Sequence, residues 1–260
     1  MRKLTAALAV VGLVAILGVP AGAAGKGELR VATSLPAPGF WNGDRPDDIT
    51  GGYEAGIAEE LATRLGYDGY SLRNVSFDAL VAGKAKGFDV AFSQVTITKE
   101  RARVVAFTRP YFSSDQGVLV AAGTTVDETN AKTIQWGVQT ATTAQSFLED
   151  ELQPEQEPRS YQETTQAFAA LQAGQVDAVM LDTAIVLAQA NESNGEFEVV
   201  GQFRTGESYG GIMPKGKNLK KQINRAIKAM DADGTLSTLA DEFLAAEFGQ
   251  DPQKVPFLEV

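Results

Sequence analysis

The chain has 260 residues, a formal net charge of −10, and no histidine or cysteine. The missing histidine and cysteine exclude Ser-His-Asp and Cys-His catalysis, histidine-ligated metal centres and disulfide bonds, so acid–base chemistry would fall to carboxylates, lysine or tyrosine. The acidic balance argues against nucleic acid and anionic membrane surfaces as partners.

The first 24 residues have the form of a secretory signal peptide. A basic start, Met1 to Lys3, precedes an apolar run over residues 4–19, and Pro20 and small residues follow at cleavage spacing. The run is shorter than the ~20 residues that a spanning helix needs, although an uncleaved anchor is the alternative. The absence of cysteine excludes a lipoprotein anchor. We therefore expect an exported protein of the periplasm or extracytoplasmic space that must rely on its core instead of disulfides.

The following segments alternate strands with helices. Residues 28–33 predict a strand, and residues 53–65 predict a helix with an apolar stripe at four-residue spacing. A strand near Tyr70 and a helix from Phe77 come next. The loop over residues 34–50 is rich in proline and glycine and carries Phe40 and Trp41. This aromatic pair serves either as a hydrophobic plug or as a wall for a ligand.

Polar side chains gather after the apolar run of residues 88–92. Ser93, Gln94 and Thr96 follow it, and Thr98 offers a helix N-cap three residues before Arg101. Polar groups that converge at the carboxyl end of a strand are typical of a small-ligand site in an open α/β sheet. The alternative is an edge strand that runs into a solvated turn.

The rest of the chain repeats this alternation. We expect short strands over residues 104–107, 117–121, 133–138, 176–181, 197–200 and 209–213. Helices are expected from the polar segment 139–143, where Thr142 or Thr143 is the cap, and over residues 162–172, 218–230 and 236–248. Trp136 lies inside a strand and is expected in the core. A calcium loop at residues 231–234 is excluded, because its required glycine would place Ala229 at the first ligand position.

Two segments share one pattern. Residues 79–93 and 170–182 each combine a helix end, a glycine-containing turn, an apolar strand led by an aspartate and polar residues at the strand exit. Asp182 lies at the second of these exits. The repetition predicts two similar α/β lobes whose strand exits face a shared crevice.

In these residues the chain resembles the amino-acid-binding proteins of bacterial ABC importers, the family 3 extracellular solute-binding proteins. The resemblance extends over about residues 28–248. The segment TITKER with FTRPYF shortly after it is its most specific part. The other matching segments are GGYEAGIAEELATRLG, WGVQTATTAQSFL, LQAGQVDAVMLDTA, SYGGIMPKG and ADGTLSTLADEF.

The resemblance implies an α/β fold of two lobes, the periplasmic-binding-protein or Venus-flytrap fold, which closes on its ligand about two hinge strands. The first lobe would comprise residues 25–114 and 214–260, and the second lobe residues 121–206. The hinge crossings would be residues 115–120 and 207–213.

The resemblance also implies roles for site residues. Arg101 would bind the α-carboxylate, with help from Thr96 and Gln94 in the first lobe, and Asp182 would bind the α-ammonium. From the second lobe, Gln139, Thr142 and Thr143 would contribute hydroxyl and backbone groups to the carboxylate. Phe40, Trp41 and Phe77 would wall the side chain. The chain departs from the family at Ser34, where many members have aspartate, and at Gln139, where many have lysine. It is also one residue short before Asp89, which leaves Ser76 as an alternative to Phe77.

These features predict a non-catalytic receptor that captures a free amino acid, neutral polar or cationic, and delivers it to an ABC permease. We expect a monomer with no cofactor and no metal. One alternative is a cleft enzyme of the prephenate or arogenate dehydratase type, for which Glu54 and Asp182 are the candidate carboxylates. Another is a sensory ligand-binding module.

Overall fold

The computed structural model describes residues 26–216 and 218–259, so the predicted signal peptide lies outside the described residues. Eight strands form one sheet in the order β2-β1-β3-β8-β4-β7-β5-β6. Two long antiparallel strands run through its middle, β4 (Ala106–Ala121) and β8 (Phe197–Met213). The shorter strands are parallel within two groups: β1 (Glu28–Thr33), β2 (Gly69–Asn74) and β3 (Val90–Ala91), and β5 (Trp136–Gln139), β6 (Arg159–Tyr161) and β7 (Ala178–Asp182).

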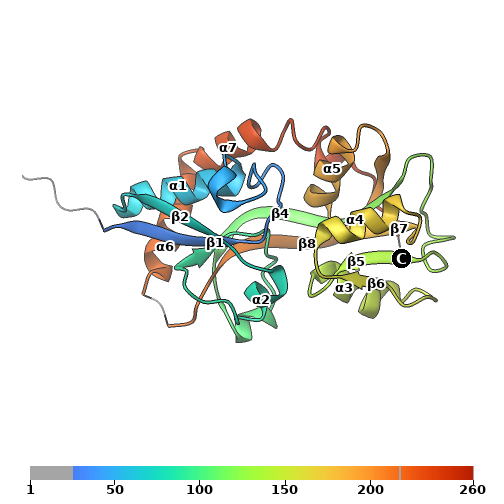
Figure 1. Cartoon of the computed structure of the whole chain (residues 1–260), viewed down its shortest axis with the longest axis horizontal. Coiled ribbons are helices and arrows are strands. Elements are labelled where there is room, and N and C mark those ends of the chain that lie inside the picture. The colour runs from blue at the N-terminus through green and yellow to red at the C-terminus, as the bar shows by residue number, and fades with distance from the viewer. Residues whose placement is uncertain (1–25, 217, 260) are drawn as a thin grey trace, which may run out of the picture.

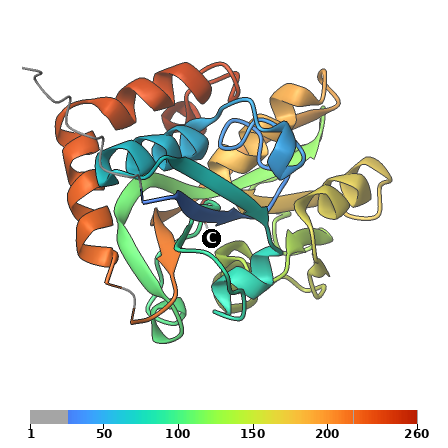
Figure 2. The ribbon, with the colours of Figure 1, turned by 60° about the vertical axis from the view of Figure 1, so that its left-hand side comes forward.

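The two groups of short strands pair with opposite ends of the long strands. β3 joins β8 where Ala91 faces Ile212, and β7 joins β4 between Gln116 and Val120. Figure 1 shows β4 and β8 running from one half of the molecule to the other, and Figure 2 shows the same division after rotation. The α/β fold class is therefore as the sequence predicts. The exact lobe and hinge boundaries stay a prediction.

Helices cover each half of the sheet. The first half carries α1 (Tyr53–Leu65), α2 (Phe77–Val81), α6 (Lys220–Ala232) and α7 (Thr235–Phe243). The second half carries α3 (Thr143–Phe147), α4 (Thr164–Gln172) and α5 (Thr183–Glu192), and a π-helical turn, Leu148–Leu152, continues α3. Single 3-10 turns lie at Pro46–Asp48, Arg101–Arg103 and Pro252–Lys254.

The prediction of separate strands over residues 104–107 and 117–121 is wrong, since both belong to β4; residues 197–200 and 209–213 likewise both belong to β8. Pro110 and the polar residues after it suggest a break, because proline cannot donate a ladder hydrogen bond. The ladder absorbs the proline through shifts of register on either side of it, between Phe107 and Phe112. The strand therefore continues through this polar segment.

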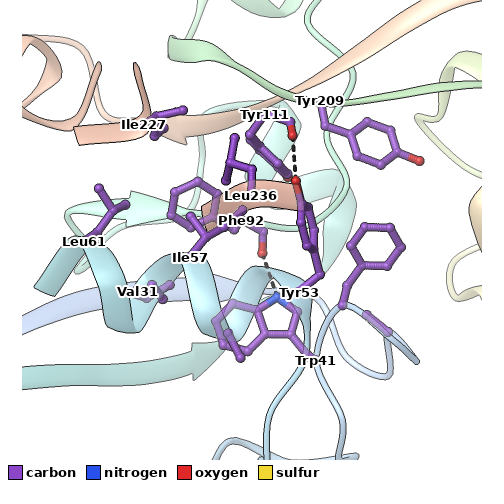
Figure 3. Packing of buried hydrophobic residues seen from close by; sticks show 14 of the residues in the cluster. Val31, Trp41, Tyr53, Ile57, Leu61, Phe92, Tyr111, Tyr209, Ile227 and Leu236 are labelled. Carbon is purple, nitrogen blue, oxygen red and sulfur yellow. Dashed lines mark hydrogen bonds between the residues drawn. The ribbon is translucent and has the colours of Figure 1, made fainter. Parts of the chain in front are cut away.

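The buried core is divided between the same two halves as the sheet. Two buried clusters lie mainly in the first half; Figure 3 shows the larger, in which Val31, Ile57 and Leu61 pack with aromatic residues. The third cluster fills the second half around Trp136, whose indole donates to the carbonyl oxygen of Ala131 at 2.7 Å. The prediction that Trp136 belongs to the core is confirmed.

The C-terminal segment connects the halves a third time. After α7, which packs on α1 in the first half, residues 251–258 lie along the second-half part of β8. Gln202 of β8 donates its backbone N–H to the carbonyl of Pro256 and accepts from Leu258, both at 2.8 Å. Its side-chain amide donates to Pro252 and Val255. The predicted lobe boundaries do not include this connection.

Candidate functional site

A cavity of about 200 Å³ lies between the two halves. Its walls come from the first loop, α2 and the exit of β3 on one side, and from the exits of β5 and β7, α4 and α5 on the other. It brings together ten of the eleven residues that the sequence suggests for a ligand site, while their individual roles stay predictions. These are Ser34, Phe40, Phe77, Gln94, Thr96, Arg101, Gln139, Thr142, Thr143 and Asp182.

Arg101 lies at the start of a 3-10 turn, where its backbone N–H donates to Thr98 Oγ1 at 3.1 Å. The guanidinium is buried, with 8% of the residue exposed, and lies 5.5 Å from the ring centre of Phe77. It donates to the carbonyl of Thr96 in its own half and to the carbonyl of Ala141 in the other half, both at 2.9 Å. The two carbonyls fix the orientation of the planar group, which can also bind a carboxylate through two N–H donors.

Asp182 ends β7 and immediately precedes α5. Only 5% of the residue is exposed, and Gln116 donates its side-chain amide to Oδ1 at 2.9 Å. Burial raises the pKa of the Asp182 carboxyl to about 7, and the charge of Glu207 adds to the effect, while Gln116 and Arg101 oppose it. This carboxyl would gain from a cationic partner, since a nearby positive charge favours its ionised form.

Backbone geometry is unusual at two strand exits that line the site. Gln94, beyond β3, has a φ of 49°, and Ala141, beyond β5, has a φ of 64°. Residues with a Cβ rarely adopt this left-handed conformation, which costs roughly 1–2 kcal/mol. At Ala141 it accompanies the carbonyl that accepts from Arg101. Strain of this kind persists where surrounding contacts hold it, and such positions cluster at functional sites.

Glu207 of β8, which sequence reasoning missed, does not line the cavity but binds two residues that do. Its Oε2 accepts from the hydroxyl of Thr96 at 2.5 Å and from the hydroxyl of Thr143 at 2.9 Å. One carboxylate therefore joins the two halves beside Arg101.

The second-half loop is held by its own hydrogen bonds. Thr142 caps α3, because its hydroxyl accepts from the backbone N–H of Gln145 at 3.1 Å and donates to the carbonyl of Gln139 at 2.7 Å. The side chain of Gln139 donates to the carbonyl of Gln162. Thr142 and Thr143 thus both use their single hydroxyl proton within the protein, and each hydroxyl also accepts one hydrogen bond there, from Gln145 and Gln116 respectively. In this arrangement neither hydroxyl has a proton to donate to a ligand carboxylate, in contrast to the expectation from the sequence.

Trp41 does not line this cavity, in contrast to the expectation that it walls the ligand. Its indole is fully buried, with 0% exposed, and donates to Glu54 Oε2 at 2.8 Å and to the carbonyl of Phe92 at 3.2 Å. A tight turn that pairs Ala37 with Trp41 directs the indole inward, while Phe40 stays at the cavity. Of the two roles considered for the aromatic pair, Trp41 therefore serves as a hydrophobic plug and does not wall the ligand. Phe77 lines the cavity as expected, and Ser76 does not.

Apart from Arg101, the charged residues of the cavity lining are acidic. Asp44, Glu163 and Glu192 line it in addition to Asp182, and Arg101 is the one cationic residue among the described lining residues. The pKa of Glu192 is raised by burial and by the charge of Asp44, and that of Glu163 is raised by burial and by the charge of Asp78. The described lining residues thus carry more negative than positive charge, since Arg101 is their one cation.

Within the described residues no group of three or more acidic side chains is arranged to hold a metal ion. Among the same residues, no helix has both the length and the apolar character to cross a membrane.

Two α/β halves, joined by two long strands and enclosing a cavity with a buried arginine and a buried aspartate, define a solute-binding protein of the periplasmic-binding-protein fold. The model of the bacterial extracellular solute-binding proteins, family 3, matches residues 29–246. The chain belongs to this family, whose members include amino-acid-binding proteins of ABC transporters.

Individual relatives bind different amino acids. The chain is 30% identical to the L-cystine-binding protein TcyJ of Escherichia coli (strain K12) over 85% of its own length and 84% of that protein. It is 28% identical to the ABC transporter arginine-binding protein 1 of the same strain, over 85% and 93% of the two chains. The structure of an ancestral arginine-binding protein bound to arginine superposes with a TM-score of 0.75 at 30% identity, over 85% of this chain and 99% of that one.

Proposed function

We propose that this protein captures a free amino acid with a cationic or neutral polar side chain, holds it between the two halves without transforming it, and delivers it to an ABC permease. The observation that carries the proposal is the placement of buried Arg101 and buried Asp182 in one cavity. A guanidinium and a carboxylate supply one partner for each charge that every α-amino acid carries.

The acidic lining favours a cationic side chain over an acidic one. Asp44, Glu163 and Glu192 would repel a second carboxylate, and a guanidinium or ammonium near Asp44 and Glu192 would relieve the repulsion between these two. The name of the arginine-binding relative agrees with this direction. Because another relative is named as an L-cystine-binding protein, the proposal also includes amino acids with a neutral polar side chain.

The geometry weakens the dehydratase alternative. Glu54, one of its two candidate carboxylates, is fully buried, is not part of the cavity lining and accepts four hydrogen bonds from the protein. Of the two candidate carboxylates, only Asp182 lines the cavity. A general acid or base must reach its substrate directly or through one water molecule.

Calorimetric titration with a panel of ligands tests the proposal. Arginine, lysine, histidine, glutamine and cystine represent the proposed classes, and glutamate and prephenate serve as contrasts. We expect a cationic or neutral polar amino acid to bind and the two contrasts not to bind. Tight binding of glutamate, or turnover of prephenate, would contradict the proposal.

Removal of either charged partner should weaken binding of the best ligand strongly. Arg101→Ala or Asp182→Ala leaves a buried ligand charge without its partner, which costs roughly 2–5 kcal/mol, or about 30- to several-thousand-fold in affinity. Arg103→Ala in the same turn and Asp177→Ala just before the same strand are the matched controls, since both side chains are exposed. A loss below about tenfold in either cavity variant, with far-UV spectrum and melting unchanged, would show that the assigned role is wrong.

A further inference from the structure

Glu54 is a buried carboxylate beneath the cavity, in the first turn of α1. The residue is 0% exposed. Its Oε1 accepts from the backbone N–H of Gln94 at 2.8 Å and from the hydroxyl of Tyr111. Its Oε2 accepts from the indole N–H of Trp41 at 2.8 Å and from the side-chain amide of Gln94 at 2.5 Å. Four donors thus satisfy both oxygens.

Three of these four hydrogen bonds come from segments that form the first-half wall of the cavity, and the fourth comes from Tyr111 of β4. Trp41 belongs to the first loop, next to Phe40, and Gln94 lies at the exit of β3. Trp41 also donates to the carbonyl of Phe92, which ties the loop to the strand exit directly (Figure 3). The backbone N–H of Glu54 donates to the carbonyl of Phe40 at 3.0 Å. A single residue therefore connects the loop, the helix and the strand exit.

Gln94 is the cavity residue that Glu54 holds most completely. Its backbone is in the left-handed conformation, and both its N–H and its side-chain amide donate to the Glu54 carboxylate. The second hydrogen of the side-chain NH₂, the amide oxygen and the backbone carbonyl are the polar groups of Gln94 that Glu54 does not use. The two hydrogen bonds to Glu54 thus stabilise a left-handed backbone conformation that residues with a Cβ rarely adopt.

We propose that Glu54 is a positioning residue of the ligand site, which acts through Gln94 by holding its backbone and side chain in the conformation that contacts the ligand. The inference rests on the proposed amino-acid-binding function.

Packing alone does not account for a carboxylate at this position. Burial raises the pKa of Glu54 to about 7 against the effect of its four donors. Well-packed apolar residues often match or exceed the stability of such buried charged groups. Fully satisfied polar networks instead fix one arrangement of their members, as Glu54 does for Gln94.

The substitution Glu54→Gln tests the proposal. Glutamine has one oxygen and one NH₂ group, so the NH₂ must face either the two donors now at Oε1 or the two now at Oε2. Each pair includes a donor of Gln94. We expect the dissociation constant of the best amino acid from the panel to rise by about tenfold or more.

Two controls separate positioning from stability. Glu60→Gln makes the same change on the exposed face of the same helix, where Glu60 pairs with Arg64, and should leave both affinity and melting unchanged. Tyr53→Phe removes a buried hydrogen bond to the carbonyl of Tyr111 without touching Glu54 or the cavity. It should lower the melting temperature and leave the affinity of the folded protein unchanged.

A double-mutant cycle tests the route through Gln94. In a Gln94→Ala background, Glu54→Gln should cost less than about threefold in affinity, because the side chain that it positions is gone. Glu54→Asp keeps the charge and withdraws the carboxylate by one methylene. If Glu54→Gln does not yield folded protein, Glu54→Asp replaces it in every measurement, and the expected results are the same.

Amide hydrogen exchange of the ligand-free protein gives a readout that needs no ligand. Glu54→Gln should accelerate exchange at the backbone N–H of Gln94 by about tenfold or more, with exchange in β5 and β7 unchanged. Three results would each overturn the proposal. The first is wild-type affinity in Glu54→Gln, and the second is a double variant whose loss of affinity equals the product of the two single losses. The third is unchanged exchange at the backbone N–H of Gln94. Failure of the wild-type protein to bind any amino acid would instead overturn the proposed function, and the exchange result would still decide whether Glu54 holds Gln94.

Discussion

Among single residues, Asp182 couples the site to pH. Its carboxyl is buried beside Glu207, and its pKa of about 7 leaves much of the protein with a neutral Asp182 at neutral pH in this arrangement of the two halves. An ammonium group at this position would favour the ionised form and lower the pKa. Binding would then release a proton from Asp182 wherever the free carboxyl is protonated.

This linkage predicts weaker binding at lower pH. Below pH 7 the carboxyl must ionise before it can pair with an ammonium, and each pH unit adds a cost of about 1.4 kcal/mol. We expect the dissociation constant to be nearly constant above pH 8 and to rise by roughly fifteenfold between pH 7 and 5.5. Titrations in buffers of different ionisation enthalpy should detect the released proton. An affinity independent of pH over this range would contradict the role of Asp182.

The sequence predicts those site residues whose residue type and position in the chain both indicate a ligand site. Asp182 ends one apolar strand and Arg101 lies shortly after another, and ligands of open α/β sheets bind in the crevice outside the carboxyl ends of the strands. Trp41 was assigned wrongly because its partners, Glu54 and Phe92, are 13 and 51 positions away along the chain. Glu207 was missed because nothing near it in the sequence indicates that its partners are Thr96 and Thr143.

Among the elements, α5 determines where Asp182 lies. The helix starts at the next residue and packs closely on β4 at Gly117. A Cβ at this glycine would lie 2.5 Å from Val186 Cγ2 and 2.9 Å from the Cα of Thr183. The absence of a side chain at Gly117 thus permits the close approach of the helix that carries the site.

We therefore expect Gly117→Ala to destabilise the fold by roughly 1–3 kcal/mol and to weaken ligand binding, because α5 must move outward together with Asp182. Gly137→Ala in β5 is the comparison, since its Cβ would meet only valine side-chain atoms at 3.0–3.3 Å, which can adjust. Thermal melting and calorimetry measure both effects. Equal losses in the two variants would rule out a special role for the contact between α5 and β4.

Element types and order were largely predictable, whereas the extent of the long strands was not. The helix over Tyr53–Leu65 has the predicted bounds, because its apolar stripe and Gly66, with a φ of 74°, both lie within the segment itself. The polar middle of β4 has no such local signal. Residues 113–116 are in strand conformation because β8 lies beside them, which only the tertiary structure reveals.

At the scale of the molecule, the two halves are joined across the cavity by hydrogen bonds. Arg101 donates to the carbonyl of Ala141, and Glu207 accepts from Thr96 on one side and Thr143 on the other. We infer that this is the closed arrangement, and that opening about β4 and β8 separates these groups. A ligand shifts such an equilibrium only by its differential affinity for the two states. In the proposed function Arg101 and Asp182 would supply that difference, because they come from opposite halves and each would bind one end of the same zwitterion.

Small-angle X-ray scattering should therefore detect a decrease in the radius of gyration when the best amino acid is added. Glutamate, which should not bind, is the control ligand. Asp182→Ala should abolish the decrease even at ligand concentrations that occupy the Arg101 side, since the second half then has no charged contact to gain. The molecular mass from the same data tests the predicted monomer. A ligand-bound protein with an unchanged radius would mean that the cavity fills without closure, and that the contacts of Arg101 and Glu207 across the cavity persist in the free protein.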